Sequence, residues 1–417
     1  MTTNVLAEIS PKSGWLDATC RRLLASRLNE LVGGGLTIRD AHGTVRLGNE
    51  APGIGVVVRN QRFYRRLVCG GTLGAGESYV DGDWDCDDLV GLVRLLVRNR
   101  AATDGLEGGA ARVAGWITRL THVLLRDNDR RGSRRNIAAH YDLGNGLFER
   151  MLDSRMQYSS AMFEGSDDLE SASRRKLDRI IAKLELNPRD HLLEIGSGWG
   201  GLAIHAARES GCRVTTTTVS RQQYEYARAR VAEAGLADRI DVLCDDYRQL
   251  TGRFSKLVSV EMVEAVGANH LDEYFRAIDR LLDDDGLALL QAITIEDSRY
   301  SQALHSVDFI KQHVFPGSFI PCVSALLASA ARASDLVTVN LEDLGADYAQ
   351  TLEAWRHRFE SQWSDIAALG YDERFRRLWR FYLCYCEGGF RERALSDVQV
   401  LLAKPGYRGR PWRVRTP

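Results

Sequence analysis

The feature that most constrains the fold of this chain is a glycine-rich turn directly after a short apolar segment. Leu193-Glu194-Ile195 ends the apolar segment, and Gly196-Ser197-Gly198-Trp199-Gly200-Gly201 follows it. Glycine lets the backbone adopt positive φ and pass close to a ligand. A helix that begins near Gly200 would offer unpaired N–H groups at its N-terminus. The sequence therefore predicts a strand, a cofactor-binding turn and a helix in succession.

The residues after this turn alternate between strand and helix patterns. Val214–Val219 is β-branched throughout and predicts a second strand, and Ser220 suits the N-cap of the helix that follows. Ile240–Leu243 and Lys256–Val260 predict two more strands. Such alternation is typical of a parallel, doubly wound α/β sheet, which binds its ligands at the carboxyl ends of the strands. We expect a Rossmann-like fold.

Two cofactor classes are compatible with the turn, a dinucleotide and S-adenosylmethionine (SAM). The spacing G-x-G-x-G-G departs from the G-x-G-x-x-G of dinucleotide-binding turns. A dinucleotide-binding protein would place an acidic residue at the end of the second strand to bind the ribose. This chain has Thr218, Ser220 and Gln223 there instead. Both observations favour SAM. Asp246, after the third strand, suits the adenine amine; the alternative for it is a solvated turn carboxylate.

A chain of 417 residues exceeds the size at which one hydrophobic core usually stops growing, so we expect two domains. Residues 1–125 are interpreted as a smaller, mainly helical, lipid-binding domain with a flexible linker, and 126–417 as the catalytic domain. Within the first, 16–32 predicts a helix, 36–40 and 56–59 predict strands, and 87–100 predicts an amphipathic helix. Its apolar face is expected to be core, with contact to a membrane as the alternative.

The net charge of −1 conceals a local cluster of basic residues. A solvated linker, nucleic acid or phospholipid head groups would each account for it, and the absence of an RNA-binding signature favours lipid over nucleic acid. The cluster consists of Arg126, Arg130, Arg131, Arg134 and Arg135.

The eight cysteines form no C-x-x-C pair and show no zinc-site spacing, which predicts no metal and a reduced, cytoplasmic setting. The sequence begins without a signal-peptide pattern, and no apolar run approaches the roughly 20 residues that span a bilayer. We therefore expect a cytoplasmic protein that is soluble or associates peripherally with the inner face of the membrane.

Several motifs, in this order and spacing, resemble the cyclopropane fatty acid synthase family. They are His140–Asn145, Gln157–Ala161, the glycine turn, Glu261–Gly267 and Gly345–Tyr348. The resemblance implies a SAM-dependent C-methyltransferase that adds a one-carbon unit to the cis double bond of an unsaturated phospholipid acyl chain at the membrane surface. It also implies a homodimer.

The resemblance further implies the cofactor pocket. Aromatic faces such as those of Tyr141 and Tyr158 can stabilise the sulfonium cation, and Glu194 offers an acceptor for polar parts of the cofactor. The expected SAM-binding residues are Tyr141, Tyr158, Ser159, Glu194, Gly196, Gly198, Gly200, Thr218, Ser220, Gln223, Asp246 and Tyr247.

Methyl transfer to an alkene leaves a carbocation, which must be shielded from water and then lose a proton to a base. In the family this base is thought to be a bound bicarbonate. Carried over residue by residue, its ligands here are Ser160, Glu264, Gln291, Ile293 and Tyr348. Cys386 matches a cysteine proposed as an active-site residue of the family, although a nucleophilic thiol is not needed for direct methyl transfer.

Three residues depart from the family pattern: Ser160 stands where cysteine is usual, Gln291 where histidine is usual, and Ala265 where the glutamate is normally followed by histidine. Glutamine donates a hydrogen bond but cannot carry positive charge or shuttle a proton as histidine does. The substitutions suggest weaker bicarbonate binding, or Glu264 itself as the base. Drift in a tolerant pocket is the alternative.

Two products therefore stay open. Proton loss from the transferred methyl closes a cyclopropane ring, and proton loss from a neighbouring carbon gives a methyl- or methylene-branched chain. Related enzymes of the second kind commonly work with a redox partner. Two other functions are compatible with the sequence: a non-catalytic protein that binds SAM and membrane, and a methyltransferase for small-molecule or mycolic-type substrates.

Overall fold

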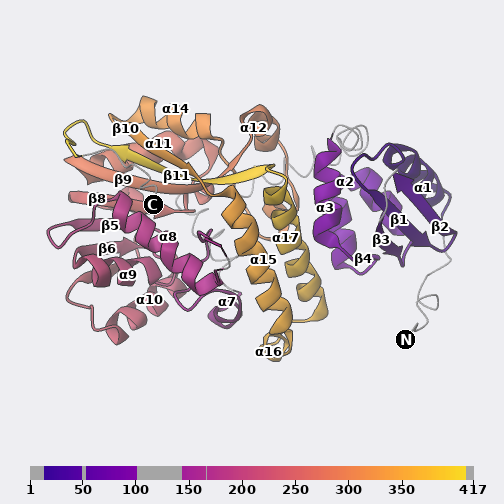
Figure 1. Ribbon diagram of the computed structural model, residues 1–417, viewed down its shortest axis with the longest axis horizontal. Helices are drawn as coiled ribbons and strands as arrows, with labels where there is room; N and C mark the ends of the chain where they lie inside the picture. The colour runs from indigo at the N-terminus through magenta and orange to yellow at the C-terminus, as the bar shows by residue number, and fades with distance from the viewer. Residues whose placement is uncertain (1–13, 49–52, 101–142, 166, 410–417) are drawn as a thin grey trace. The chain divides into compact units, whose positions relative to one another are not determined.

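The computed structural model describes residues 14–48, 53–100, 143–165 and 167–409 (Figure 1). The chain divides into two compact units. The first comprises residues 1–125, 305–314 and 367–394, and the second comprises 126–304, 315–366 and 395–417. The expected division at residue 125 differs from this arrangement, because it placed 305–314 and 367–394 in the catalytic domain.

The first unit combines helices with a four-stranded sheet of order β2-β1-β3-β4. Its strands are β1 (Gly35–Asp40), β2 (Gly43–Gly48), β3 (Gly53–Val58) and β4 (Trp84–Cys86). Its helices are α1 (Trp15–Leu28), α2 (Arg62–Val80), α3 (Leu89–Arg98), α13 (Phe309–His313) and α17 (Glu373–Arg391). The helix expected at the start of the chain and both expected strands are present.

Packing of α17 explains why a late segment of the chain belongs to this unit. Helix α17 packs against α2 and α3, and a Cβ added at Gly388 would lie only 2.6 Å from Cγ1 of Val93 on α3. The apolar face of α3, which includes Leu89 and Leu92, is buried. This stripe is therefore core, and the alternative of membrane contact by this face is wrong.

The second unit is built on a seven-stranded sheet of order β10-β11-β9-β8-β5-β6-β7. Its strands are β5 (His191–Ile195), β6 (Arg213–Thr217), β7 (Ile240–Leu243), β8 (Phe254–Val260), β9 (Leu282–Ile295), β10 (Val337–Asp343) and β11 (Leu395–Ala403). Strands β5 to β9 pair in parallel, and β10 and β11 pair antiparallel. The first strand, β5, lies between β6 and β8, so later strands are added first on one side of β5 and then on the other. The strand order therefore reverses at β5, and sheets of this type bind ligands at the carboxyl end of such a strand.

Helices cover both faces of this sheet. The helices are α7 (Asn145–Met151), α8 (Leu169–Lys183), α9 (Gly201–Ser210), α10 (Arg221–Glu233), α11 (Leu271–Leu281), α12 (Asp297–Leu304), α14 (Val323–Ala333), α15 (Gly345–Ser361) and α16 (Trp363–Ala368), with short 3₁₀ turns η3 (Tyr247–Gln249), η4 (Val263–Ala265) and η5 (Ala268–His270).

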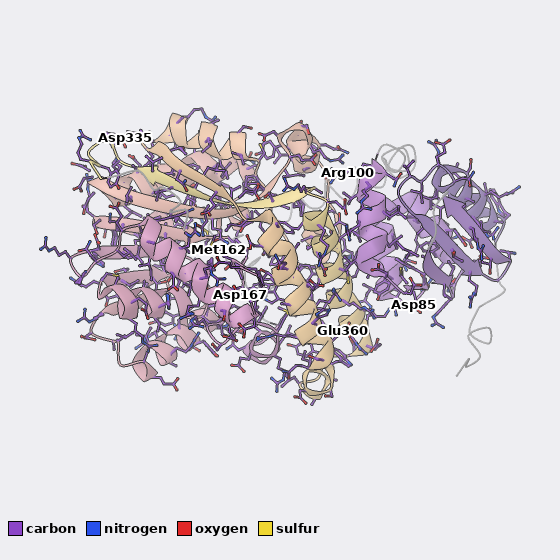
Figure 2. The ribbon with its side chains drawn as sticks, in the orientation of Figure 1. Asp85, Arg100, Met162, Asp167, Asp335 and Glu360 are labelled. Carbon is purple, nitrogen blue, oxygen red and sulfur yellow. The ribbon has the colours of Figure 1, made fainter. Side chains whose placement is uncertain are left out.

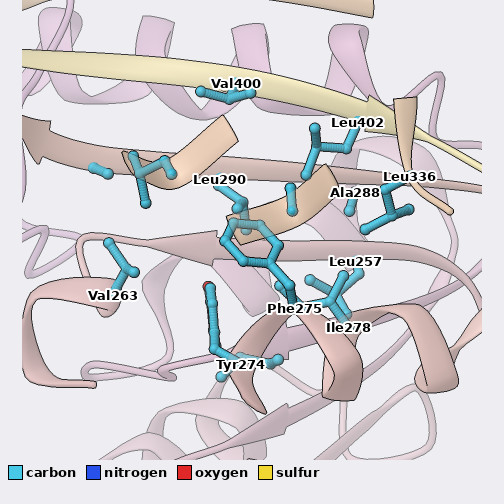
Figure 3. Packing of buried hydrophobic residues seen from close by; sticks show 14 of the residues in the cluster. Leu257, Val263, Tyr274, Phe275, Ile278, Ala288, Leu290, Leu336, Val400 and Leu402 are labelled. Carbon is cyan, nitrogen blue, oxygen red and sulfur yellow. The ribbon is translucent and has the colours of Figure 1, made fainter. Parts of the chain in front are cut away.

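Two hydrophobic cores lie on opposite sides of the sheet. On one side Tyr274, Phe275 and Ile278 of α11 pack on strand residues such as Leu257 and Leu290 (Figure 3). On the other side α8, α9 and α10 pack on the alternate strand residues. Successive strand residues point to opposite faces, so each strand contributes to both cores. The expected Rossmann-like α/β fold is confirmed. Within the described ranges, no helix has the length and apolar character needed to cross a membrane.

Candidate functional site

The glycine turn has the strained backbone that its sequence predicts. Gly196, Gly198 and Gly200 have φ of 99°, 48° and 81°, a region that favours glycine. The N–H groups of Gly196 and Ser197 both donate to the carbonyl oxygen of Thr217 at 3.0 Å, which fixes the turn against β6. A Cβ added at Gly198 would meet no atom within 4 Å. The turn is thus fixed to β6 on one side and has open space next to Gly198, which a bound cofactor requires.

Buried polar residues surround this turn at the ends of β5 and β6. The Glu194 carboxylate accepts a hydrogen bond from Oγ1 of Thr216 at 2.6 Å, and burial raises its pKa to about 8. Thr218 donates from Oγ1 to Oε1 of Gln223 at 2.9 Å. Ser220 caps α10 by accepting the N–H of Gln223. These residues fit SAM: Glu194 and Thr218 offer polar atoms at the strand ends, and the glycines let the ligand approach the backbone.

Asp246 has a local structural partner. Arg248 donates to Oδ1 of Asp246 from Nε at 2.9 Å and to Oδ2 from Nη2 at 2.6 Å. Tyr247 begins η3, and its ring meets that of Tyr274 edge-on, with centroids 5.6 Å apart. Contact of Asp246 and Tyr247 with adenine therefore stays a prediction, with Arg248 holding the carboxylate in place.

The segment before α8 carries Tyr158, Ser159 and Ser160 over the sheet. Met162 and Asp167, which lie beside α8 (Figure 2), are both bound by the guanidinium of Arg175. Lys176, the next residue of α8, is fully buried and donates to Oγ of Ser159 at 2.7 Å and to Oε1 of Gln157 at 3.0 Å. Tyr141, also predicted to bind the cofactor, lies outside the described residues, as do the arginine cluster and the predicted linker.

An aromatic cluster joins the glycine turn to this segment. The Tyr158 ring lies 5.2 Å from Phe148 and 5.1 Å from Trp355 between centroids, and Phe148 in turn lies 4.9 Å from Trp199 of the glycine turn. Trp355 also meets Tyr348 edge-on at 6.0 Å. Aromatic faces stabilise cations, so this cluster suits both a sulfonium and a carbocation.

The residues predicted to bind bicarbonate are brought together, but around a carboxylate of the chain itself. The main-chain N–H of Ser160 donates to Oε1 of Glu261 at 2.7 Å, and Nε2 of Gln291 donates to the same oxygen at 2.9 Å. The Tyr348 hydroxyl donates to Oε2 at 2.7 Å. Three of the predicted ligands are thus already occupied by Glu261, so the residues present do not fit a bicarbonate ion.

The other two predicted ligands pair with each other. The N–H of Ile293 donates to Oε1 of Glu264 at 2.6 Å. Oε2 of Glu264 is buried and has no hydrogen-bond partner. Burial, with a smaller contribution from the charge of Glu261, raises the pKa of Glu264 to about 8. The Glu261 carboxylate thus accepts three hydrogen bonds, one fewer than the roughly four acceptor sites of a carboxylate, and the neighbouring Glu264 has one oxygen without a hydrogen-bond partner.

Four polar residues of this cluster were missed from the sequence: Lys176, Glu261, Asp397 and Gln399. Nε2 of Gln291 also donates to Oδ2 of Asp397 at 2.9 Å, and its Oε1 accepts from Nε2 of Gln399 at 3.1 Å. A detectable signal existed for Lys176, which shares the apolar face of α8 with Leu169, Ala172 and Ile180. Asp397 and Gln399 alternate with apolar residues along β11.

Cys386 lies on α17 and belongs to the first unit. Burial raises the pKa of its thiol. Because the thiolate is the nucleophile, this surrounding disfavours the proposed reactivity.

Comparison with known proteins identifies the family of this chain. Residues 128–400 match the family model described as mycolic acid cyclopropane synthetase. The chain is 36% identical over 382 residues to the tuberculostearic acid methyltransferase UfaA1 of Mycobacterium tuberculosis, covering 89% of this chain and 88% of the relative. It is 37% identical over 348 residues to the cyclopropane-fatty-acyl-phospholipid synthase of Escherichia coli K12, covering 83% and 87%.

Solved structures give the same result. The cyclopropane synthase MmaA2 of M. tuberculosis matches with a TM-score of 0.61 and 27% identity, over 65% of this chain and 98% of that one. The mycolic acid cyclopropane synthase CmaA1, in complex with SAH and CTAB, matches with a TM-score of 0.61 and 28% identity, over the same shares. The chain therefore belongs to the cyclopropane synthase family of SAM-dependent methyltransferases.

Proposed function

We propose that this enzyme transfers the methyl group of SAM to the cis double bond of unsaturated phospholipid acyl chains and forms a cyclopropane ring. The observation that carries the proposal is the aromatic cluster, which extends from the glycine turn through Tyr348 to the carboxylate of Glu261. One end of this arrangement suits a methyl donor, and the other suits the acceptance of a proton. The 37% identity to a relative named for this activity supports it.

Each group of residues has a definable role in this proposal. Bound SAM supplies an electrophilic methyl group. The glycine turn and Glu194 hold the cofactor, and the faces of Tyr158 and Trp355 stabilise positive charge that develops on the acyl chain. Burial of the site excludes water, which would otherwise capture the carbocation. A carboxylate next to these rings accepts the proton.

A branched chain is the second candidate product. The departure of Gln291 from the family pattern favours it, because an uncharged amide changes the group that would remove the proton. A relative named as a tuberculostearic acid methyltransferase matches more of the chain than the cyclopropane synthase does. Conversion of a methylene branch to a saturated methyl branch would also require a reducing partner.

The test is incubation of the purified protein with SAM and vesicles of dioleoyl phosphatidylglycerol, followed by mass spectrometry of the acyl chains. A ring and a methylene branch have the same mass, so the chains are also analysed after mild hydrogenation. Among the chains that have gained one carbon, it adds two hydrogens to the branched alkene and none to the ring. S-adenosylhomocysteine formation that requires the vesicles supports the proposal. Binding of SAM without turnover would instead indicate a non-catalytic SAM- and membrane-binding protein.

Peripheral binding to the inner face of the membrane is part of the same proposal. Trp15, Leu16 and Leu23 on α1 are exposed, with Trp15 at 76%, and basic residues accompany them on this helix. An exposed indole beside basic residues suits a lipid interface. Flotation with anionic vesicles tests this, with two variants: Trp15→Ser, and glutamine at Arg130, Arg131, Arg134 and Arg135. Light scattering tests the proposed homodimer.

A further inference from the structure

The ligand set expected to hold a bicarbonate ion is satisfied by Glu261. Its carboxylate accepts hydrogen bonds from the Ser160 N–H, the Gln291 amide and the Tyr348 hydroxyl, at 2.7, 2.9 and 2.7 Å. These donors come from three separate parts of the chain: the segment before α8, strand β9 and helix α15. A carboxylate and a bicarbonate present the same pair of oxygens, which explains how one can take the place of the other.

The backbone conformation of Glu261 is energetically unfavourable for a residue other than glycine. Glu261 has φ of 47°, in the left-handed region that favours glycine. Its N–H donates to the carbonyl oxygen of Gln291 at 2.8 Å, which holds the strained residue at the end of β8. Backbone strain of this kind concentrates at functional sites. A glycine would relieve the strain, so turn geometry alone does not explain a glutamate here.

The groups around Glu261 keep its carboxylate basic. All three donors to it are uncharged. Glutamine at position 291 also donates to Asp397 and accepts from Gln399, which fixes the amide so that its nitrogen faces the carboxylate. Burial raises the pKa of Glu261. The hydrogen bonds that its carboxylate accepts, and the positive charge of Lys176, lower the pKa by a smaller amount. A histidinium in place of Gln291 would pair with the carboxylate and weaken it as a base.

We propose that the Glu261 carboxylate replaces the bicarbonate of related enzymes and serves as the general base that removes the proton from the methylated acyl chain. This inference rests on the proposed function. As the methyl–sulfur bond breaks and a carbon–carbon bond forms, the acyl chain becomes a carbocation. Glu261 takes the proton, and the electron pair of the broken C–H bond closes the ring or forms a new double bond. The resulting carboxylic acid returns its proton to water after product release.

The experiment compares the wild type with Glu261→Gly and Glu261→Gln in buffer purged of carbon dioxide, with and without sodium bicarbonate or sodium formate. We expect wild-type turnover on dioleoyl phosphatidylglycerol vesicles to change less than twofold on adding bicarbonate. Glu261→Gly should lose at least about 100-fold of turnover, a typical contribution of a general base, and regain at least tenfold with bicarbonate or formate. Glu261→Gln should stay inactive with either ion, because its side chain still fills the site.

Glu185→Gly is the matched control. Glu185 is also a glutamate with positive φ, 54°, but it is exposed at the end of α8. This variant should keep wild-type turnover and show no response to bicarbonate. Calorimetric titration with SAM verifies that each variant is folded.

Three results would overturn the inference: wild-type activity that depends on added bicarbonate, a fully active Glu261→Gln, or a SAM-binding Glu261→Gly that neither anion restores. A wild-type protein without turnover on unsaturated vesicles would refute the proposed function itself, and so the two failures can be told apart.

Discussion

We propose that single carboxyl groups shielded from water carry much of the chemistry of this protein. Glu194 lies near the end of β5, Glu261 directly follows β8, and Glu264 lies in η4. Burial raises the pKa of each. A buried carboxyl that resists ionisation is unusual for a structural role and typical of sites that bind cations or move protons.

Glu194 predicts a pH dependence of stability. Its pKa is about 8 in the folded protein against an ordinary value of 4.5, so the folded state retains a proton that the unfolded chain has lost. The free energy of unfolding should therefore fall as pH rises from 4.5 to about 8. Glu194→Gln keeps an acceptor for Thr216 and should make this slope shallower by up to ~1.4 kcal/mol per pH unit. Urea unfolding at several pH values measures it; parallel slopes would contradict the assignment.

Gly198 predicts an effect on cofactor binding. With φ of 48° and open space where a Cβ would lie, Gly198→Ala should cost ~1 kcal/mol of stability and place a methyl group where the ligand approaches. We expect SAM affinity to fall at least about tenfold, or ~1.4 kcal/mol. Gly235→Ala is the control, since Gly235 also has positive φ, 68°, and open space but follows α10. Equal SAM affinities in the two variants would argue against a cofactor over Gly198.

At the level of elements, the parts of the candidate site come from β5, β8, β9 and β11. The carboxyl end of β5 gives the glycine turn, the end of β8 gives Glu261, and β9 gives Gln291 two residues before Ile293. The pairing of Gln399 with Gln291 and of Asp397 with Ile293 brings β11 into the same cluster. Because side chains alternate along a strand, all four of these residues share the face that α8 covers.

The packing of α17 on α3 gives a prediction for the first unit. A Cβ at Gly388 would meet Val93 at 2.6 Å, so Gly388→Ala should destabilise the protein by ~1–3 kcal/mol. Val93→Gly removes both obstructing atoms, Cγ1 at 2.6 Å and Cβ at 2.7 Å, and the double variant should be more stable than the sum of the single effects predicts, by ~1 kcal/mol. Thermal unfolding of the four proteins measures this coupling. Strictly additive effects would show that the two side chains do not meet.

At the level of the whole molecule, the chain alternates between its two units instead of completing one before the other. Residues 305–314 contribute α13 to the first unit, and the chain then returns to the second unit. Residues 367–394 contribute α17 to the first unit and are followed by β11 of the second. Neither unit is a continuous piece of sequence.

A fragment of residues 126–417 should therefore not behave as an independent domain. Without α2 and α3, buried side chains of α17 such as Phe381, whose ring lies 5.6 Å from that of Tyr79 on α2, would lose their cover and promote aggregation. We expect the fragment to be mostly insoluble under conditions in which the full chain is soluble, as measured by centrifugation and gel filtration. A monodisperse fragment with wild-type SAM affinity would refute this.

The sequence by itself determined the Rossmann-like fold and the glycine turn, because strand alternation and glycines suited to positive φ are local patterns; the gathering of Ser160, Gln291 and Tyr348 followed from the resemblance to the cyclopropane fatty acid synthase family. Only the tertiary structure showed that these donors converge on Glu261, that Lys176 and Asp397 are buried beside them, and that α17 belongs with the first unit. These facts depend on which segments, up to hundreds of residues apart, meet in space, and no local pattern encodes the target of a hydrogen bond or the partner of a helix face.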